Sequence, residues 1–66
     1  MLHVRFEGRS RDVPLKQLNL TAAMSDAHIL SSVADLLEVR RERLSDYVVD
    51  RRPNGNLVVC PEAVYG

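Results

Sequence analysis

Arginine is the side chain in this sequence whose clustering can do chemistry. Residues 40–52 carry five arginines against three carboxylates, which gives this segment a net charge of +2. The guanidinium group is a planar fork of donors that suits a carboxylate or a phosphate. The functional interpretation of the cluster is a docking patch for an acidic partner surface. The interpretation that we favour is a solvated rim whose ion pairs contribute little each. The arginines that we expect to contact a partner are Arg43, Arg51 and Arg52.

The other reactive side chains do not combine into a catalytic or metal-binding set. Cys60 is a lone thiol at the end of an apolar run, and no histidine stands beside it in the sequence to act as a base. His3 and His28 lie far apart, and no second cysteine completes a metal site with them. The sequence has neither a glycine-rich phosphate loop nor a nucleophile elbow. We therefore expect no enzyme activity, no metal and no cofactor of the chain's own.

Length and composition narrow the class of protein. The chain has 66 residues, of which 45% are hydrophobic and 27% charged. This composition is typical of one small folded domain, which has little room for an enclosed active site. Nine basic and nine acidic side chains cancel, which argues against a general nucleic-acid binder. The sequence shows no signal peptide and no run near the ~20 apolar residues of a membrane helix. We expect a cytoplasmic protein that does not contact membranes.

The first part of the chain predicts a β-hairpin. Apolar residues alternate with polar ones, which indicates a strand over residues 2–7. Residues 8–10 supply the turn, in which Gly8 is free to take a positive φ. A second strand is expected over residues 11–15. Pro14 places that strand at a sheet edge, because proline cannot donate a hydrogen bond to a ladder.

One amphipathic helix is the clearest element of the pattern. Apolar residues at spacings of three and four predict it over residues 26–38, with Ser25 or Asp26 as the N-cap. The apolar spacing that continues to Leu44 also resembles a helix-turn-helix DNA reader. That motif needs a residue tolerant of the left-handed conformation in its tight turn, where this chain has Glu38. Strand-like residues 47–49 follow too early for a recognition helix, so we do not expect nucleic-acid binding.

The last part of the chain predicts a second hairpin. Pro53-Asn54-Gly55 has the residue types of a turn, and it joins strands over residues 47–51 and 57–60. Pro61 is expected to end the last strand. The element order is then ββαββ, an α+β fold in which one helix packs on a mixed four-stranded sheet in two layers. In such a fold the first and last strands can pair in parallel at the sheet centre.

This pattern resembles the β-grasp, or ubiquitin-like, family over nearly the whole chain. Residues 1–6 resemble the family's first strand, and Ser25-Asp26 is similar to the start of the ubiquitin helix. Residues 38–44 resemble the short passage that leads from the helix to the next strand. Residues 57–66 are similar to a final strand with a glycine-ended tail, as in bacterial ubiquitin-like modifiers and sulfur carriers.

The resemblance implies a chemistry for a C-terminal tail over residues 62–66, which follows a β-grasp domain over residues 1–61. In this family the carboxylate of the terminal glycine, here Gly66, attacks ATP inside an E1-like adenylating enzyme. A thiol, a sulfide or an amine then captures the adenylate, and an E2-like enzyme and a processing protease can act in the same system. Glycine suits this role because, without a Cβ, it can thread a narrow channel. Val64 and Tyr65 would be the residues that the partner enzyme reads.

Three functions follow as hypotheses from the resemblance. The first is a ubiquitin-like modifier activated at Gly66, because the chain ends in Tyr65-Gly66 where the usual sulfur carriers end in two glycines. The second is a sulfur carrier with a C-terminal thiocarboxylate. The third is a β-grasp interaction subunit of a larger complex, in which the tail has no chemistry.

Overall fold

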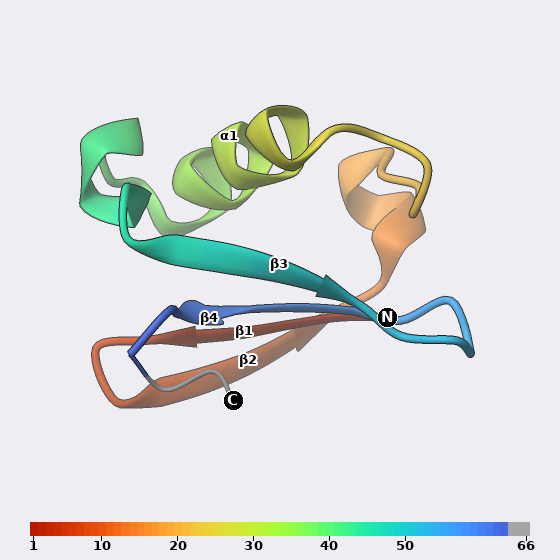
Figure 1. The fold of residues 1–66 in the computed structure, drawn as a ribbon. Coiled ribbons are helices and arrows are strands. Elements are labelled where there is room, and N and C mark those ends of the chain that lie inside the picture. Colours follow the sequence, from red (N-terminus) through yellow and green to blue (C-terminus); the bar gives the residue numbers. More distant parts are fainter. Residues whose placement is uncertain (64–66) are drawn as a thin grey trace.

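The structure, a computed structural model, describes residues 1–63. One α-helix lies over one face of a sheet, so the described part of the chain forms two layers (Figure 1). The element order is the predicted ββαββ, and the fold is α+β. The strands are β1 (Leu2–Phe6), β2 (Arg9–Val13), β3 (Tyr47–Arg51) and β4 (Leu57–Pro61), the helix is α1 (Asp26–Leu37), and two short 3-10 helices are η1 (Leu15–Leu18) and η2 (Arg41–Leu44).

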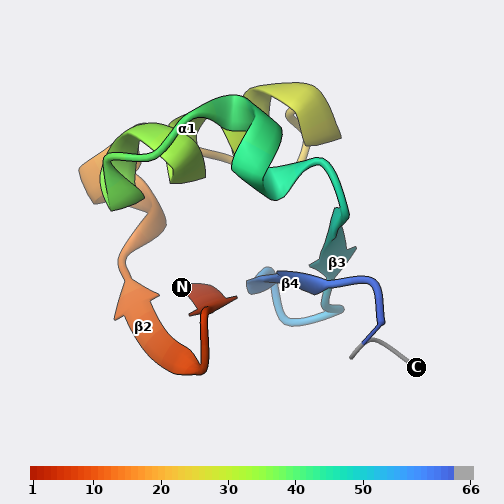
Figure 2. The same cartoon turned by 90° about the vertical axis from the view of Figure 1, so that its left-hand side faces the viewer.

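The four strands form one mixed sheet in the order β2-β1-β4-β3. β1 and β4 pair in parallel at its centre, with Leu2 opposite Leu57 and Val4 opposite Val59. Each central strand pairs on its other side with its hairpin partner, in antiparallel orientation. Figure 2 shows α1 above the sheet, with the edge strands β2 and β3 on either side. The predicted central parallel pair is confirmed, and the topology is consistent with a β-grasp fold.

The core lies between α1 and the two central strands. Alternation along β1 and β4 turns one set of side chains toward the helix, and the helical period of α1 turns its apolar stripe toward the sheet. Phe6 and Leu37 are partly buried and pack against this core. The side chains that are at most 1% exposed are Leu2, Val4, Ile29, Val33, Leu44, Leu57 and Val59.

The first hairpin differs from the prediction in its turn. Glu7 and Gly8 alone form the turn, with φ values of 51° and 78°. A two-residue type I′ turn requires positive φ at both positions, and it suits the right-handed twist of the flanking strands. β2 therefore runs over Arg9–Val13, whereas the prediction placed it over residues 11–15. The prediction was wrong because it assigned the polar residues after Gly8 to the turn.

Local backbone geometry fixes both ends of α1. At its start, the Ser25 hydroxyl accepts a hydrogen bond from the His28 backbone N–H at 3.2 Å, which is N-cap geometry. At its end, Glu38 adopts the left-handed conformation with a φ of 57°, which was not expected of a glutamate there. The next element is the four-residue η2, and the strands β3 and β4 follow it. Among residues 1–63, no second helix follows α1 that is long enough to be a DNA recognition helix.

The second hairpin follows the prediction closely. Gly55 takes a φ of 89° in the turn between β3 and β4. β4 is one residue longer than predicted, because Pro61 still pairs with Tyr47. The first residue after β4 is still hydrogen-bonded to the domain, because the Glu62 N–H donates to the Asp46 carbonyl oxygen at 2.8 Å. The central strand β4 therefore leads directly into the C-terminal residues.

The core assignment can be tested with two alanine variants on the same helix. Ile29 is 0% exposed, whereas Leu36 is only partly buried. We expect Ile29→Ala to lower the free energy of unfolding by about 2–5 kcal/mol, because it leaves a cavity against the sheet. Leu36→Ala should cost less than half as much. Urea unfolding followed by circular dichroism measures both values.

Two controls keep this test decisive. If Ile29→Ala does not fold, Ile29→Val should cost about 1 kcal/mol, and Leu36→Val should cost less. Equal losses at the two positions would contradict a core that lies between α1 and the central strands.

Candidate functional site

The arginines of residues 40–52 do not form one continuous patch of free charge. Arg43, Arg51 and Arg52 each contact a different carboxylate, and the three contacts lie on different elements. Arg43, on η2, donates from Nη2 to Glu7 Oε1 in the turn of the first hairpin. Its guanidinium carbon also lies 5.5 Å from the centroid of the Phe6 ring, within reach of a cation–π interaction. Arg43 thus ties η2 to the first hairpin.

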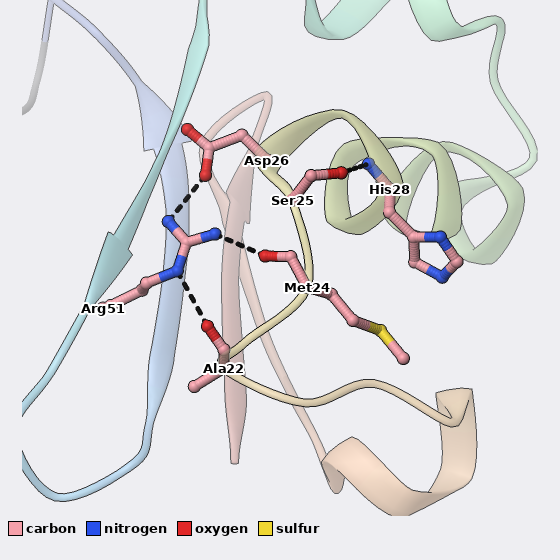
Figure 3. Close-up of polar contacts among 6 residues, drawn as sticks. All are labelled: Ala22, Met24, Ser25, Asp26, His28 and Arg51. Atoms are coloured by element: carbon pink, nitrogen blue, oxygen red, sulfur yellow. Dashed lines mark hydrogen bonds and ion pairs between the residues drawn. The ribbon is translucent and has the colours of Figure 1, made fainter.

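Arg51 connects the edge strand β3 to the segment that leads into α1 (Figure 3). Its Nε donates to the Ala22 carbonyl oxygen at 2.9 Å, and its Nη2 donates to the Met24 carbonyl oxygen at 2.7 Å. Its Nη1 lies 2.6 Å from Asp26 Oδ1 in the first turn of the helix. All three nitrogens of this guanidinium have partners in the chain. The contacts give Arg51 a structural role as a brace, and its predicted contact with a partner stays a prediction.

Arg52 stands at the second hairpin turn. Its Nε lies 2.8 Å from Asp50 Oδ2, while its backbone N–H donates to the Asn56 carbonyl oxygen at 2.8 Å. The Arg52 side chain is 54% exposed. The Asp50 side chain is only 18% exposed, so this ion pair is open to solvent on its arginine side alone. Arg52 remains accessible to another molecule from that side.

An open groove lies between β2 and the end of α1, on the opposite side of the molecule from the Arg51 brace. Its volume is about 500 Å³. Its apolar floor and wall come from β1, the last turn of α1 and the residue after the helix cap: Val4, Phe6, Leu37 and Val39. The left-handed turn at Glu38 places the last of these, because the Val39 N–H then donates back to the Ala34 carbonyl oxygen at 3.0 Å.

The charged wall of the groove comes from the first hairpin. Arg11 lies opposite Val4, and Arg9 lies opposite Phe6 in the antiparallel pair of β1 and β2. Residues that lie directly opposite share one face of a sheet, so both arginines stand on the face that α1 covers elsewhere. Both residues are exposed and line the groove. The sequence-based site missed them, although alternation counted from a two-residue turn would have placed them there.

The electrostatics of the groove follow from which of its charges are paired. Glu7, its one lining carboxylate, is already bonded to Arg43. Within residues 1–63, neither Arg9 nor Arg11 makes an ion pair. The groove therefore combines an apolar floor with two positive charges that no described acidic residue offsets, which suits an anionic ligand with an apolar part.

The predicted reactive end lies outside the described residues. Val64, Tyr65 and Gly66 are not placed, and the described chain reaches Ala63. Both Glu62 and Ala63 are exposed. The start of the predicted tail is thus accessible, and it leaves from the central strand β4.

The remaining candidate groups are dispersed. His3 lies on the sheet face opposite the core, where its Nδ1 is 2.6 Å from Asp12 Oδ1. Cys60 is buried and makes no disulfide. Among residues 1–63, no group of three or more histidine, cysteine, aspartate or glutamate residues is placed to hold a metal ion. None of the helices in this part of the chain has the length and apolar character needed to cross a membrane.

The Arg51 brace predicts a specific loss of order. Arg51→Ala removes two charge-assisted hydrogen bonds and one ion pair, and we expect it to lower the free energy of unfolding by about 1–2 kcal/mol. Amide hydrogen exchange over residues 22–28 should become faster. Arg51→Lys should restore only part of the loss, because an ammonium group lacks the planar fork. Arg52→Ala, which removes one ion pair and no contact with residues 22–28, is the matched control, and an equal effect from it on exchange over residues 22–28 would contradict the brace.

Neither the fold nor the groove can be compared with that of a known relative. No protein-family model, no curated protein and no solved structure matches this chain. The assignment of a function therefore depends on the topology and on the two surfaces described above: the C-terminal end of β4 and the groove beside β2.

Proposed function

We propose that this chain is a ubiquitin-like protein modifier whose reactive group is the carboxylate of Gly66. In this role the chain supplies no catalytic side chain. An E1-like enzyme binds the domain, uses ATP to adenylate Gly66, and transfers the acyl group to a thiol or to a target amine. An E2-like enzyme and a processing protease are the further partners that such a system uses.

The path of the chain out of β4 is the observation that carries this proposal. β4 is held on both sides, by β1 and by β3, so its end has a defined position and direction. Glu62 is attached to Asp46 by one backbone hydrogen bond, and both Glu62 and Ala63 are exposed. A carboxylate carried three residues beyond this point can reach an active site in another protein, because an extended residue spans about 3.3 Å.

A sulfur carrier is the closest alternative, since it uses the same topology and the same terminal carboxylate. The two roles differ in the nucleophile that captures the adenylate: sulfide for a carrier, a thiol or amine for a modifier. The ending Tyr65-Gly66, in place of two glycines, is what favours the modifier.

A β-grasp interaction subunit is the second candidate, and the groove beside β2 favours it. That groove offers a binding surface on residues that the tail chemistry does not need. In this role the terminal residue carries no reaction.

Intact-protein mass spectrometry of the chain recovered from its native host tests the proposal. A modifier should appear as covalent adducts joined through Gly66, and Gly66→Ala or one residue added after Gly66 should abolish them. Gly66→Ala adds a Cβ where the tail must pass through a narrow channel. A residue added after Gly66 moves the terminal carboxylate away from the position at which it would react. Lys16→Gln, an exposed change on η1, is the control that should keep the adducts.

Each outcome assigns a class. A terminal mass increase of about 16 Da, from oxygen replaced by sulfur, would mean a carrier and would overturn the modifier. Only unmodified chain, recovered in a stable non-covalent complex, would mean an interaction subunit.

A further inference from the structure

We infer that the outer edge of β3 is a self-association surface, at which two copies of this chain pair their β3 strands in antiparallel orientation around Val49. The two sheets then continue into each other across a twofold axis. β3 is available for this pairing because, in the described sheet, it is an edge strand that pairs only with β4 (Figure 2). The inference uses no residue of the groove beside β2 and no reaction at Gly66.

The first support is the direction of the backbone groups along β3. At one end of the strand the Asp46 carbonyl oxygen accepts from the Glu62 N–H, and at the other end the Arg52 N–H donates to the Asn56 carbonyl oxygen, both at 2.8 Å. The backbone groups of successive residues in an antiparallel strand point to opposite sides, and the register between β3 and β4 has no break. The even-numbered positions therefore face β4.

The odd-numbered positions of β3 direct their backbone N–H and C=O groups away from β4. These positions are Tyr47, Val49 and Arg51. Within residues 1–63, none of the backbone hydrogen bonds outside the helices and strands involves them. Such a row of donors and acceptors is a template for another strand. In a pair of β3 strands centred on Val49, every one of these positions meets another of the same row, so the rows of the two copies satisfy each other.

The second support is that β3 lacks the features that protect an edge strand from pairing. Natural edges carry charged side chains, proline or a bulge. The other edge, β2, presents Arg9 and Arg11, which have no acidic partner among residues 1–63. On β3, residues 47–49 are uncharged. Its arginine, Arg51, is bonded to Asp26 and to two carbonyl oxygens. Of the two edges of the sheet, β3 is therefore the one that is open to pairing.

The third support is that the charges select the register. A twofold pair centred on Val48 would set Asp46 opposite Asp50, and one centred on Asp50 would set that residue opposite its own copy. Like charges directly opposite each other destabilise a strand pair. A centre at Tyr47 would require η2, which is not extended, to join the ladder. Among these neighbouring registers, the one centred on Val49 places no like charges opposite each other.

The register centred on Val49 also forms new favourable contacts. The opposed residues are Asp46 with Arg52, Tyr47 with Arg51, Val48 with Asp50, and Val49 with its own copy. Asp46 is exposed and makes no ion pair among residues 1–63, and the Arg52 side chain is 54% exposed. Because each copy supplies both residues, an ion pair lies at each end of the interface. At its centre, the partly buried Val49 gains apolar cover.

Amide hydrogen exchange at micromolar and millimolar protein tests the inference on the unmodified sequence. Two short strands bury less than the about 1,200 Å² of a stable interface, so we expect a weak dimer. At millimolar protein the amides of residues 47, 49 and 51 should exchange about threefold more slowly or less, in proportion to the dimer population. The amides of residues 48 and 50, which already bond to β4, should change less. Sedimentation velocity should show the shift from monomer to dimer.

Charge reversal in two separate variants locates the register. Asp46→Lys and Arg52→Glu each set like charges opposite each other, so each alone should weaken the dimer about tenfold or more. An equimolar mixture should dimerise again, because each variant then meets an opposite charge on the other. Asp46 and Arg52 stand at opposite ends of β3, so this recovery can come only from pairing between copies.

Matched controls separate this effect from a general change in charge. Asp35→Lys on α1 and Lys16→Glu on η1 are the same reversals at exposed positions away from β3, and they should keep the dimer. The amide spectrum of each variant shows whether it is folded. If Arg52→Glu does not fold, Arg52→Gln should still weaken the dimer, since it removes the attraction to Asp46 of the second copy.

The contrary results are equally specific. A chain that stays monomeric at millimolar concentration, with unchanged exchange at residues 47, 49 and 51, would overturn the inference. A dimer that protects residues 9–13 of β2 would also overturn it, as would equal weakening by the controls or a mixture that does not recover. Adducts at Gly66 are measured separately by mass, so a monomeric chain with adducts would remove this inference and leave the modifier, and a dimer without adducts would do the reverse.

Discussion

The parallel pairing of β1 with β4 is the constraint on which the rest of the structure depends. These strands come from opposite ends of the chain, so their pairing closes a loop of most of its length, which costs conformational entropy. The contact is reinforced at the chain start, where the Leu57 N–H donates to the Met1 carbonyl oxygen at 2.9 Å and the terminal ammonium donates to Asn56 Oδ1 at 3.0 Å. Once these strands are joined, each hairpin partner has a fixed neighbour and the helix has a surface to cover.

A single helix of 12 residues cannot cover four strands evenly, and its position decides which surface stays open. The Arg51 contacts hold the start of α1 beside β3. On the other side, β2 presents Arg9 and Arg11 where a covered strand would present apolar side chains. The brace on one edge and the charges on the other are therefore two parts of one arrangement, in which the helix lies closer to β3 and leaves the groove beside β2.

The sequence predicts the elements well because each has a strong local signal. Alternation of apolar and polar residues predicts the strands, and apolar residues at spacings of three and four predict α1. The residue types of Pro53-Asn54-Gly55 predict the second turn. The first turn was misplaced because Glu7 carries no signal for a positive φ; it adopts one because the strands on both sides fix the register. The candidate site was harder to predict. Which arginines are engaged depends on contacts between residues distant in sequence, such as Arg51 with Ala22.

Pairing within the chain, more than clustering along it, decides which charges can act on another molecule. Arg43 and Arg51 lie in the densest arginine segment, yet both are engaged by partners within the protein. Arg9 and Arg11 lie outside that segment and have no acidic partner among residues 1–63. A net charge of zero is thus compatible with a local field, because the opposite charges that balance it are held elsewhere on the surface. The same separation gives the chain a basic groove at one edge of the sheet and an accessible strand end at its centre, two surfaces that do not share residues.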